Sequence, residues 1–169
     1  MTDQTITDMT LTTEWNLPVA QVREKLLNLQ EACLTMPQVE TPIKEFFSDG
    51  TYGREIFIPK GTCLVGEIHK TEWIIVVSRG KIKVVSEEGI SIVDATEHPV
   101  TFISPAGVKR AGYALEDTWW TGFRHTGNLT TAEIRKEHLA ESYNSLEKPN
   151  VGSNSSSSNL SGLSSVPST

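Results

Sequence analysis

The feature that most constrains the fold of this sequence is a series of short β-rich runs between Phe46 and Phe123. Turns containing Gly, Pro or Ser, among them one at 78–80, separate the runs at intervals of roughly 8–12 residues. No helical segment lies between the runs, so parallel β-α-β units are excluded. The pattern predicts an all-β domain over 46–126, a sandwich or a closed barrel. Strands are expected over Tyr52–Ile58, Thr62–His69, Trp73–Val77, Lys81–Val85, Ile90–Val93, Val100–Ile103, Val108–Leu115 and Thr118–Phe123.

An amphipathic helix is predicted ahead of this domain, over roughly 17–34. Asn16 is expected to cap it, with Pro18 in its first turn. Such a helix is not stable alone in water, so its apolar stripe must lie on the sheet or on a partner chain. Residues 16–45 are therefore expected to be a helix followed by a linker. The stripe consists of Val19, Val22, Leu26, Leu29 and Cys33.

The two ends of the chain have a different character. Residues 1–15 are Thr-rich and polar without a period, which predicts a flexible arm. Within 127–148, Thr130 and Glu133 form a capping-box pattern that predicts a short helix. The Ser-rich segment 149–169 holds too few apolar residues to order itself and is expected to be a disordered tail.

Composition excludes several classes of partner. The net charge of −6 argues against a nucleic-acid surface, which needs a basic stripe. No apolar run approaches the length of a membrane span, and the N-terminus lacks the pattern of a secretory signal. Cys33 and Cys63 are expected to be buried free thiols in a reducing compartment. The protein is therefore expected in a cytoplasm.

Polar residues gather between two of the apolar runs, at Glu67, His69 and Glu72. Glu67 and His69 are two residues apart on a predicted strand and so face the same way. With His125 as a further nitrogen ligand, they are candidates for a site holding Fe, Mn, Ni or Zn. The alternative is a hydrogen-bonded polar rim at the mouth of the barrel.

This arrangement resembles the first motif of the cupin superfamily, and Pro105 to Gly107 is similar to the turn of the second motif. The resemblance covers roughly 46–126. It implies a jelly-roll β-barrel, here with an N-terminal amphipathic helix and a short C-terminal helix. Of the three histidines usual in the superfamily only His69 is present, and Arg110 stands where the second motif has its histidine. The first-motif positions are Gly61, Glu67, His69, Glu72 and Gly80.

Several runs resemble, within cupins, a group of small cupin-like proteins encoded by tailed phages and prophages. Among them are DGTYGREIFIPKGT, GEIHKTE and SPAGVKRAGYA. This resemblance implies a phage or prophage origin and action in the host cytoplasm, with association with the virion as an alternative. It implies no activity. Small cupins often form dimers, so a homo-oligomer is expected, with a dimer favoured.

A permanent cation at position 110 changes the chemistry of the predicted site. Arg110 would repel a divalent ion and suits a carboxylate or phosphate, which arginine binds through paired hydrogen bonds. Alternatively, Arg110 pairs with Glu67 or Glu72 in an internal salt bridge. The candidate ligand-binding residues are Arg110, His69, Glu72 and Tyr113.

Residues around this site are assigned more ordinary roles. Lys109 alternates to the other strand face and is expected to be solvated. Arg54 and Glu55 are interpreted as rim charges. Trp119 and Trp120 must point to opposite faces, one of them toward the barrel interior.

Three hypotheses about function follow from the sequence. The first is a non-catalytic protein that binds a small, anionic ligand or a partner in its barrel. The second is a metal-dependent cupin enzyme, a dioxygenase or isomerase. The third is a structural or interaction module of a phage particle. No nucleophile with a neighbouring histidine and acid is recognisable, so no catalytic residue is assigned.

Overall fold

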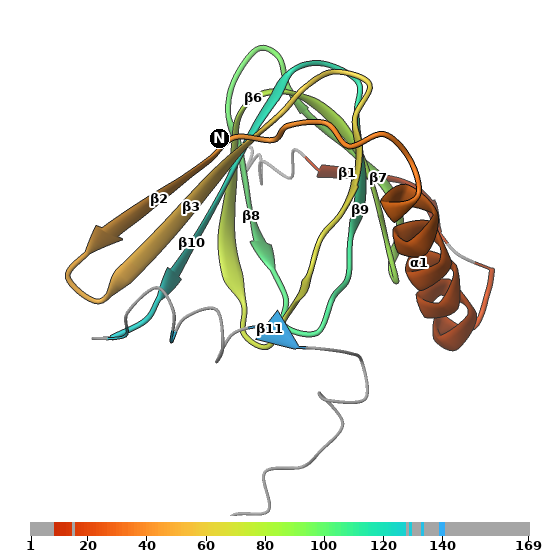
Figure 1. The fold of residues 1–169 in the computed structure, drawn as a ribbon, viewed down its shortest axis with the longest axis horizontal. Helices are drawn as coiled ribbons and strands as arrows, with labels where there is room; N and C mark the ends of the chain where they lie inside the picture. Colours follow the sequence, from red (N-terminus) through yellow and green to blue (C-terminus); the bar gives the residue numbers. More distant parts are fainter. Residues whose placement is uncertain (1–8, 15, 128, 130–132, 134–138, 141–169) are drawn as a thin grey trace, which may run out of the picture.

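The computed structural model describes residues 9–14, 16–127, 129, 133 and 139–140, which form a curled β structure with one helix at its side (Figure 1). The fold is mostly β, as predicted. The helix is α1, Val19–Leu34. The strands are β1 Met9–Glu14, β2 Ile43–Ser48, β3 Thr51–Ile58, β4 Cys63–Val65, β5 Ile68–His69, β6 Trp73–Ser86, β7 Gly89–Ala95, β8 Val100–Ser104, β9 Ala111–Ala114, β10 Thr118–His125 and β11 Leu139–Ala140.

Two antiparallel sheets share the long strand β6. The first half of β6 lies between β10 and β8, and β10 continues the sheet to β3 and the edge strand β2. The second half lies between β7 and β9, which continue to β1 and β4. The sheets face each other around the core, so the predicted jelly-roll fold is confirmed.

Gly80 marks the point at which β6 passes from one sheet to the other. The turn predicted at 78–80 is wrong, because the strand continues through it with Gly80 at φ 106°. A register shift against β10 accompanies this point, between Trp119 and Trp120. The buried positions of β6 change from odd (Trp73, Ile75) to even ones, so both halves direct their apolar side chains inward.

The core lies between the two sheets on either side of this bend. Its buried members come from β3, β6, β7, β8 and β9, and alternation along each strand separates them from polar neighbours on the outer face. The buried hydrophobic residues of this cluster are Tyr52, Ile58, Trp73, Ile75, Val77, Ile82, Val84, Val93, Ala95, Val100 and Ala114.

Helix α1 packs on the outside of the β structure, as its predicted stripe requires. Val22 and Leu26 are buried against Ala111. The stripe is shorter than predicted, because Val19 is 51% exposed. The cap also differs, since Pro18 occupies the N-cap position and no side chain caps the helix. No helix in the described part of the chain has the length and apolar character needed to cross a membrane.

Three predicted segment boundaries near the ends of the described chain are wrong. Met9–Glu14, predicted as part of a flexible arm over 1–15, form β1 beside β7. Strand β2, Ile43–Ser48, begins inside the expected linker. Leu139–Ala140, within the segment predicted as a helix, pair with β5 as β11. Thr130 of the capping box, most of 127–148 and the tail 149–169 lie outside the described residues.

Candidate functional site

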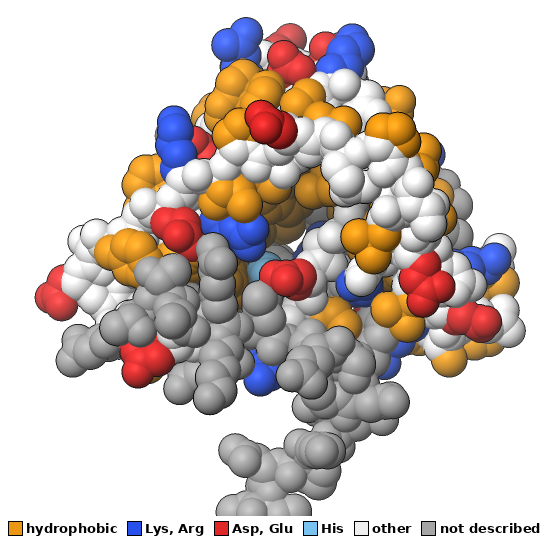
Figure 2. All heavy atoms as spheres, viewed as in Figure 1, with side chains coloured by type: hydrophobic (Ala, Val, Ile, Leu, Met, Phe, Trp, Pro, Cys, Tyr) orange, Lys and Arg blue, Asp and Glu red, His pale blue; other side chains and the backbone are white. Residues whose placement is uncertain are grey.

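A cavity of about 400 Å³ lies between the two sheets. Figure 2 shows a hollow with apolar walls, with Lys or Arg and His side chains at its edge. Such a volume suits one small molecule. The apolar lining includes Ile56, Ile58, Leu64, Trp73, Ile75, Ile82, Val84 and Trp120, and the polar lining consists of Arg54, Glu67, His69, Ser104 and Arg110.

Strand periodicity places the lining side chains. Arg54, Ile56 and Ile58 are two residues apart on β3, so all three face the cavity. The same alternation directs Trp120 inward, where its ring centroid lies 5.6 Å from that of Phe102. Trp119 contacts Phe57 on the other face, with ring centroids 4.7 Å apart. The prediction that the two tryptophans point to opposite faces is confirmed.

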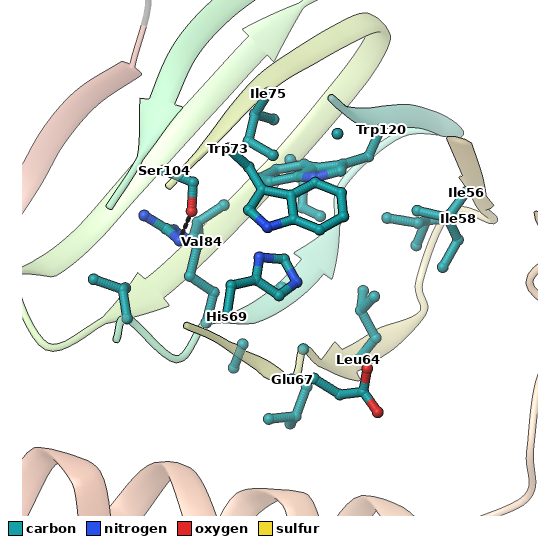
Figure 3. Close-up of a pocket in the computed structure, with 18 of the residues that line it drawn as sticks. Ile56, Ile58, Leu64, Glu67, His69, Trp73, Ile75, Val84, Ser104 and Trp120 are labelled. Carbon is teal, nitrogen blue, oxygen red and sulfur yellow. Dashed lines mark hydrogen bonds between the residues drawn. The ribbon is translucent and has the colours of Figure 1, made fainter. Parts of the chain in front are cut away.

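Trp73 and His69 form a stacked pair at the cavity wall. Their ring centroids are 4.5 Å apart with an interplanar angle of 25° (Figure 3). The guanidinium carbon of Arg124 lies 5.7 Å from the centroid of the Trp73 ring, and Arg124 donates a hydrogen bond to Thr71. Trp73 Nε1 is buried without a hydrogen-bond partner among the described residues. A buried N–H without an acceptor indicates a place for a ligand atom or a water molecule.

Gly122 provides the space that the Trp73 indole occupies. A Cβ at this position would lie 2.7 Å from Trp73 Cε3, and the rigid indole cannot turn its end away. We expect Gly122→Ala to shift Trp73, lower the free energy of unfolding by about 1–3 kcal/mol and change the near-UV circular dichroism. Urea unfolding measures the first effect.

Gly112→Ala is the matched control for this prediction. Its Cβ would lie 2.8 Å from Ile82 Cδ1, the end of a flexible side chain that can move. We expect this variant to lose less than about 1 kcal/mol. Equal losses in the two variants would contradict a specific role of Gly122 in seating Trp73.

Arg110, the residue directly before β9, lines the cavity together with His69, as the sequence predicted. Its Nη1 donates a hydrogen bond to Ser104 Oγ at 2.5 Å. Burial lowers the pKa of Arg110, and the charges of Glu88 and Glu87 oppose that change only in part. The predicted salt bridge to Glu67 or Glu72 is absent from the ion pairs of the described residues. The Arg110 cation therefore lacks a carboxylate partner in this part of the chain.

Arg54 is a second cation in the cavity, although the sequence predicts a position at the rim for it. Its Nε is buried without a hydrogen-bond partner among the described residues. The sequence feature that could have placed Arg54 in the cavity is its spacing of two and four residues from Ile56 and Ile58, which puts all three on the same strand face. Glu55 does point the other way and lies 3.6 Å from Lys44.

Lys109 also differs from its prediction. Only 4% of the residue is exposed, and Nζ donates a hydrogen bond to the Gly66 carbonyl oxygen at 3.1 Å. Its main-chain N–H donates to the carboxylate of Glu87. Burial lowers the pKa of Lys109, against the opposing charges of Glu67 and Glu87. The Lys109 side chain links the loop before β9 to the main chain at Gly66, and it does not line the cavity.

The structure does not assemble the predicted metal ligands. Glu72 is exposed outside the cavity lining, and His125 is exposed at the end of β10, beside Gly50. Glu67 lines the cavity, but Figure 3 shows its carboxylate directed away from the His69 ring. No group of three His, Cys, Asp or Glu side chains in the described residues is placed to hold a metal ion. The proposed set His69, Glu67, Glu72 and His125 is therefore wrong as one site.

Tyr113 is also misplaced in the predicted ligand set. It is 46% exposed, and it is absent from the cavity lining although its neighbours Ala111 and Gly112 contribute to it. Of the predicted ligand-binding residues, Arg110 and His69 meet in the cavity, whereas Glu72 and Tyr113 do not. Ser104, Arg54 and Glu67 complete the polar lining that the tertiary structure brings together.

The fold and the cavity together define a jelly-roll protein with a cationic, apolar-walled interior. Neither a family profile nor a curated protein matches the sequence. Solved structures that resemble the fold include cupin-domain proteins. A cupin domain from Bordetella pertussis is 14% identical over 54% of this chain and 99% of its own, with a TM-score of 0.44.

Two further structures illustrate the range of these neighbours. An RmlC-like cupin family protein from Methanocaldococcus jannaschii is 8% identical over 52% of this chain and 81% of its own, with a TM-score of 0.42. Salicylate 1,2-dioxygenase from Pseudaminobacter salicylatoxidans is 13% identical over 62% of this chain and 32% of its own, with a TM-score of 0.44. These likenesses concern the fold alone.

Proposed function

We propose that this protein is a small cupin-like binding protein that holds a small anion with an apolar body in its cavity. The observation that carries this proposal is the placement of two arginines, Arg54 and Arg110, in one cavity without a carboxylate partner among the described residues. A desolvated guanidinium gains most from a bound carboxylate or phosphate.

The remaining lining supports an amphipathic anion over a bare inorganic ion. The walls are mainly branched aliphatic side chains with Trp73 and Trp120, which favour an apolar ligand body. Trp73 Nε1 adds a neutral donor that has no hydrogen-bond partner in the described part of the chain. Among the described residues, Glu67 is the only acidic one in the lining, and its carboxylate turns away from His69. The electrostatic balance inside the cavity therefore favours negative charge.

Calorimetric titration tests the proposal directly. The probes are apolar monocarboxylates of increasing size, their neutral amides, and inorganic phosphate. We expect the carboxylates to bind and the matched amides to bind at least about tenfold more weakly, because the amide lacks the charge that the arginines recognise. Equal affinity for acid and amide, or no binding by any carboxylate that fits about 400 Å³, would overturn the proposal.

Self-association belongs to the same proposal. The edge strand β2 exposes Ile43, Phe46 and Phe47, which are 44%, 46% and 54% exposed. Contact with a second copy would remove this apolar surface from water. Light scattering of the purified chain decides between dimer and monomer. The phage or prophage origin and the host cytoplasm as the place of action rest on the sequence resemblance, and assaying purified virions tests the alternative of a particle component.

A further inference from the structure

Two cysteines far apart in the chain meet on the outside of the barrel. Cys33 Sγ and Cys63 Sγ lie 3.8 Å apart, one in the last turn of α1 and the other at the first residue of β4. Cys63 is exposed and Cys33 is partly exposed, so the prediction of two buried thiols is wrong. They are the only cysteines of the chain.

The packing of α1 explains why the two thiols meet. Leu26 is buried against the barrel, and Cys33 lies two turns further along the same face of the helix. Val65 packs against the same helix residues, and Cys63, two residues before it on β4, faces the same way. The contact between the two thiols therefore follows from the way the helix packs on the barrel, and it does not depend only on the side-chain rotamers.

We propose that Cys33 and Cys63 form a redox modification site, in which a peroxide converts the two thiols into a disulfide that ties α1 to β4. One thiolate attacks a peroxide oxygen, so an S–O bond forms, the O–O bond breaks and hydroxide leaves. The second thiol attacks this sulfenic sulfur, so the S–S bond forms and the S–O bond breaks with loss of water. In sum the two thiols lose two electrons and two protons, and the peroxide is reduced to two waters.

A disulfide requires the two sulfurs to approach from 3.8 Å to about 2.05 Å. Cys33 lies in the last turn of α1, and helix ends fray, so this end of the helix can shift toward β4. Desolvation, the larger cause, and the adjacent Cys33 thiol both raise the pKa of Cys63. Because the thiolate is the reactive form and the pKa of Cys63 is raised, the reaction is expected to accelerate with rising pH and to continue accelerating above about pH 9. Excess thiol reductant reverses it by exchange.

The bond would link the helix to the cavity wall. Leu64, the residue after Cys63, lines the cavity, so oxidation fixes a wall strand against α1. The bond also closes a loop between positions 30 residues apart, which restricts the unfolded chain. We expect the thermal midpoint of the oxidised protein to rise by roughly 5–10 °C.

The experiment uses the full chain, treated at low protein concentration with hydrogen peroxide, then alkylated and digested with trypsin. The expected result is joint loss of both free thiols and a linked pair of peptides, 26–44 with 61–70. Treatment with dithiothreitol should restore both thiols and the original thermal midpoint. The proposal would be overturned if both thiols still reacted fully with the alkylating reagent after peroxide treatment. It would also be overturned if disulfide bonds formed only between different molecules.

Cys33→Ser and Cys63→Ser are the matched controls. Each keeps one thiol, so peroxide should leave its thermal midpoint unchanged and yield only a sulfenic acid, detected with a dimedone probe. A rise in thermal midpoint in either variant equal to that of the parent would show that the stabilisation has another origin, and would contradict the proposal. The thiol, peptide and thermal measurements do not require a ligand, so their result is independent of what the cavity binds.

Discussion

Arg110→Met is expected to weaken the binding of an apolar carboxylate by about 100-fold while leaving stability nearly unchanged. The loss corresponds to the one or two charge-assisted hydrogen bonds that a desolvated guanidinium makes. Stability should change by less than about 1 kcal/mol, because the Arg110 guanidinium makes one hydrogen bond among the described residues, to Ser104, and its charge is costly to bury. Calorimetry and urea unfolding measure the two quantities.

Arg79→Met is the matched control for this variant. The Arg79 guanidinium carbon lies on the outer face, 5.8 Å from the centroid of the Trp119 ring, and the residue is exposed. The same change of charge outside the cavity should leave affinity within about twofold, because exposed charges are screened by water and salt. An equal loss in both variants would mean that net charge governs binding and would remove Arg110 as the anchor.

Gly80→Ala is expected to lower the free energy of unfolding by about 3–5 kcal/mol, a large part of the total for a domain of this size. Gly80 has φ 106°, which an L-residue rarely adopts. A Cβ there would also overlap the Asp117 carbonyl oxygen and lie 2.7 Å from Thr118 Cα, and both are backbone atoms that cannot turn aside. The thermal midpoint should fall by roughly 10–15 °C in differential scanning calorimetry.

Gly61→Ala separates the two causes of this loss. Gly61 also has positive φ, at 80°, but its Cβ would meet no atom within 4 Å. We expect it to cost only about 1 kcal/mol, the conformational penalty alone. If Gly80→Ala costs no more than Gly61→Ala, close packing at the bend of β6 is not what requires glycine there.

The all-β architecture could be predicted because its signal is local. Alternation and turn residues are visible in the sequence. Polar and apolar residues alternate from Lys81 to Val84 whatever the position of this strand in the sheet. The turn predicted at 78–80 failed for a physical reason. A glycine that ends a strand and a glycine that lets a strand bend between sheets have the same local pattern, and only the partners β10 and β7 distinguish them.

The candidate site was predicted only in part. Arg110 and His69 could be named because the motif resemblance ties positions far apart in the chain to one cavity. Arg54 was missed, since a charged residue on a strand is ordinarily directed to water and only closure of the sheet turns its face inward. Lys109 was assigned to solvent on alternation alone, which cannot show that the loops around Gly66 and Glu87 cover it.

By itself the sequence determined the run of strands between Tyr52 and Phe123, the amphipathic helix and the replacement of a motif histidine by a cation. These depend on periodicity and residue type along a short stretch of chain. Only the tertiary structure decided which side chains share the cavity, that Glu72, Tyr113 and His125 stay outside it, and that Cys33 meets Cys63. Such meetings depend on register, sheet curvature and helix docking, which are properties of the whole chain and are not encoded in any single segment.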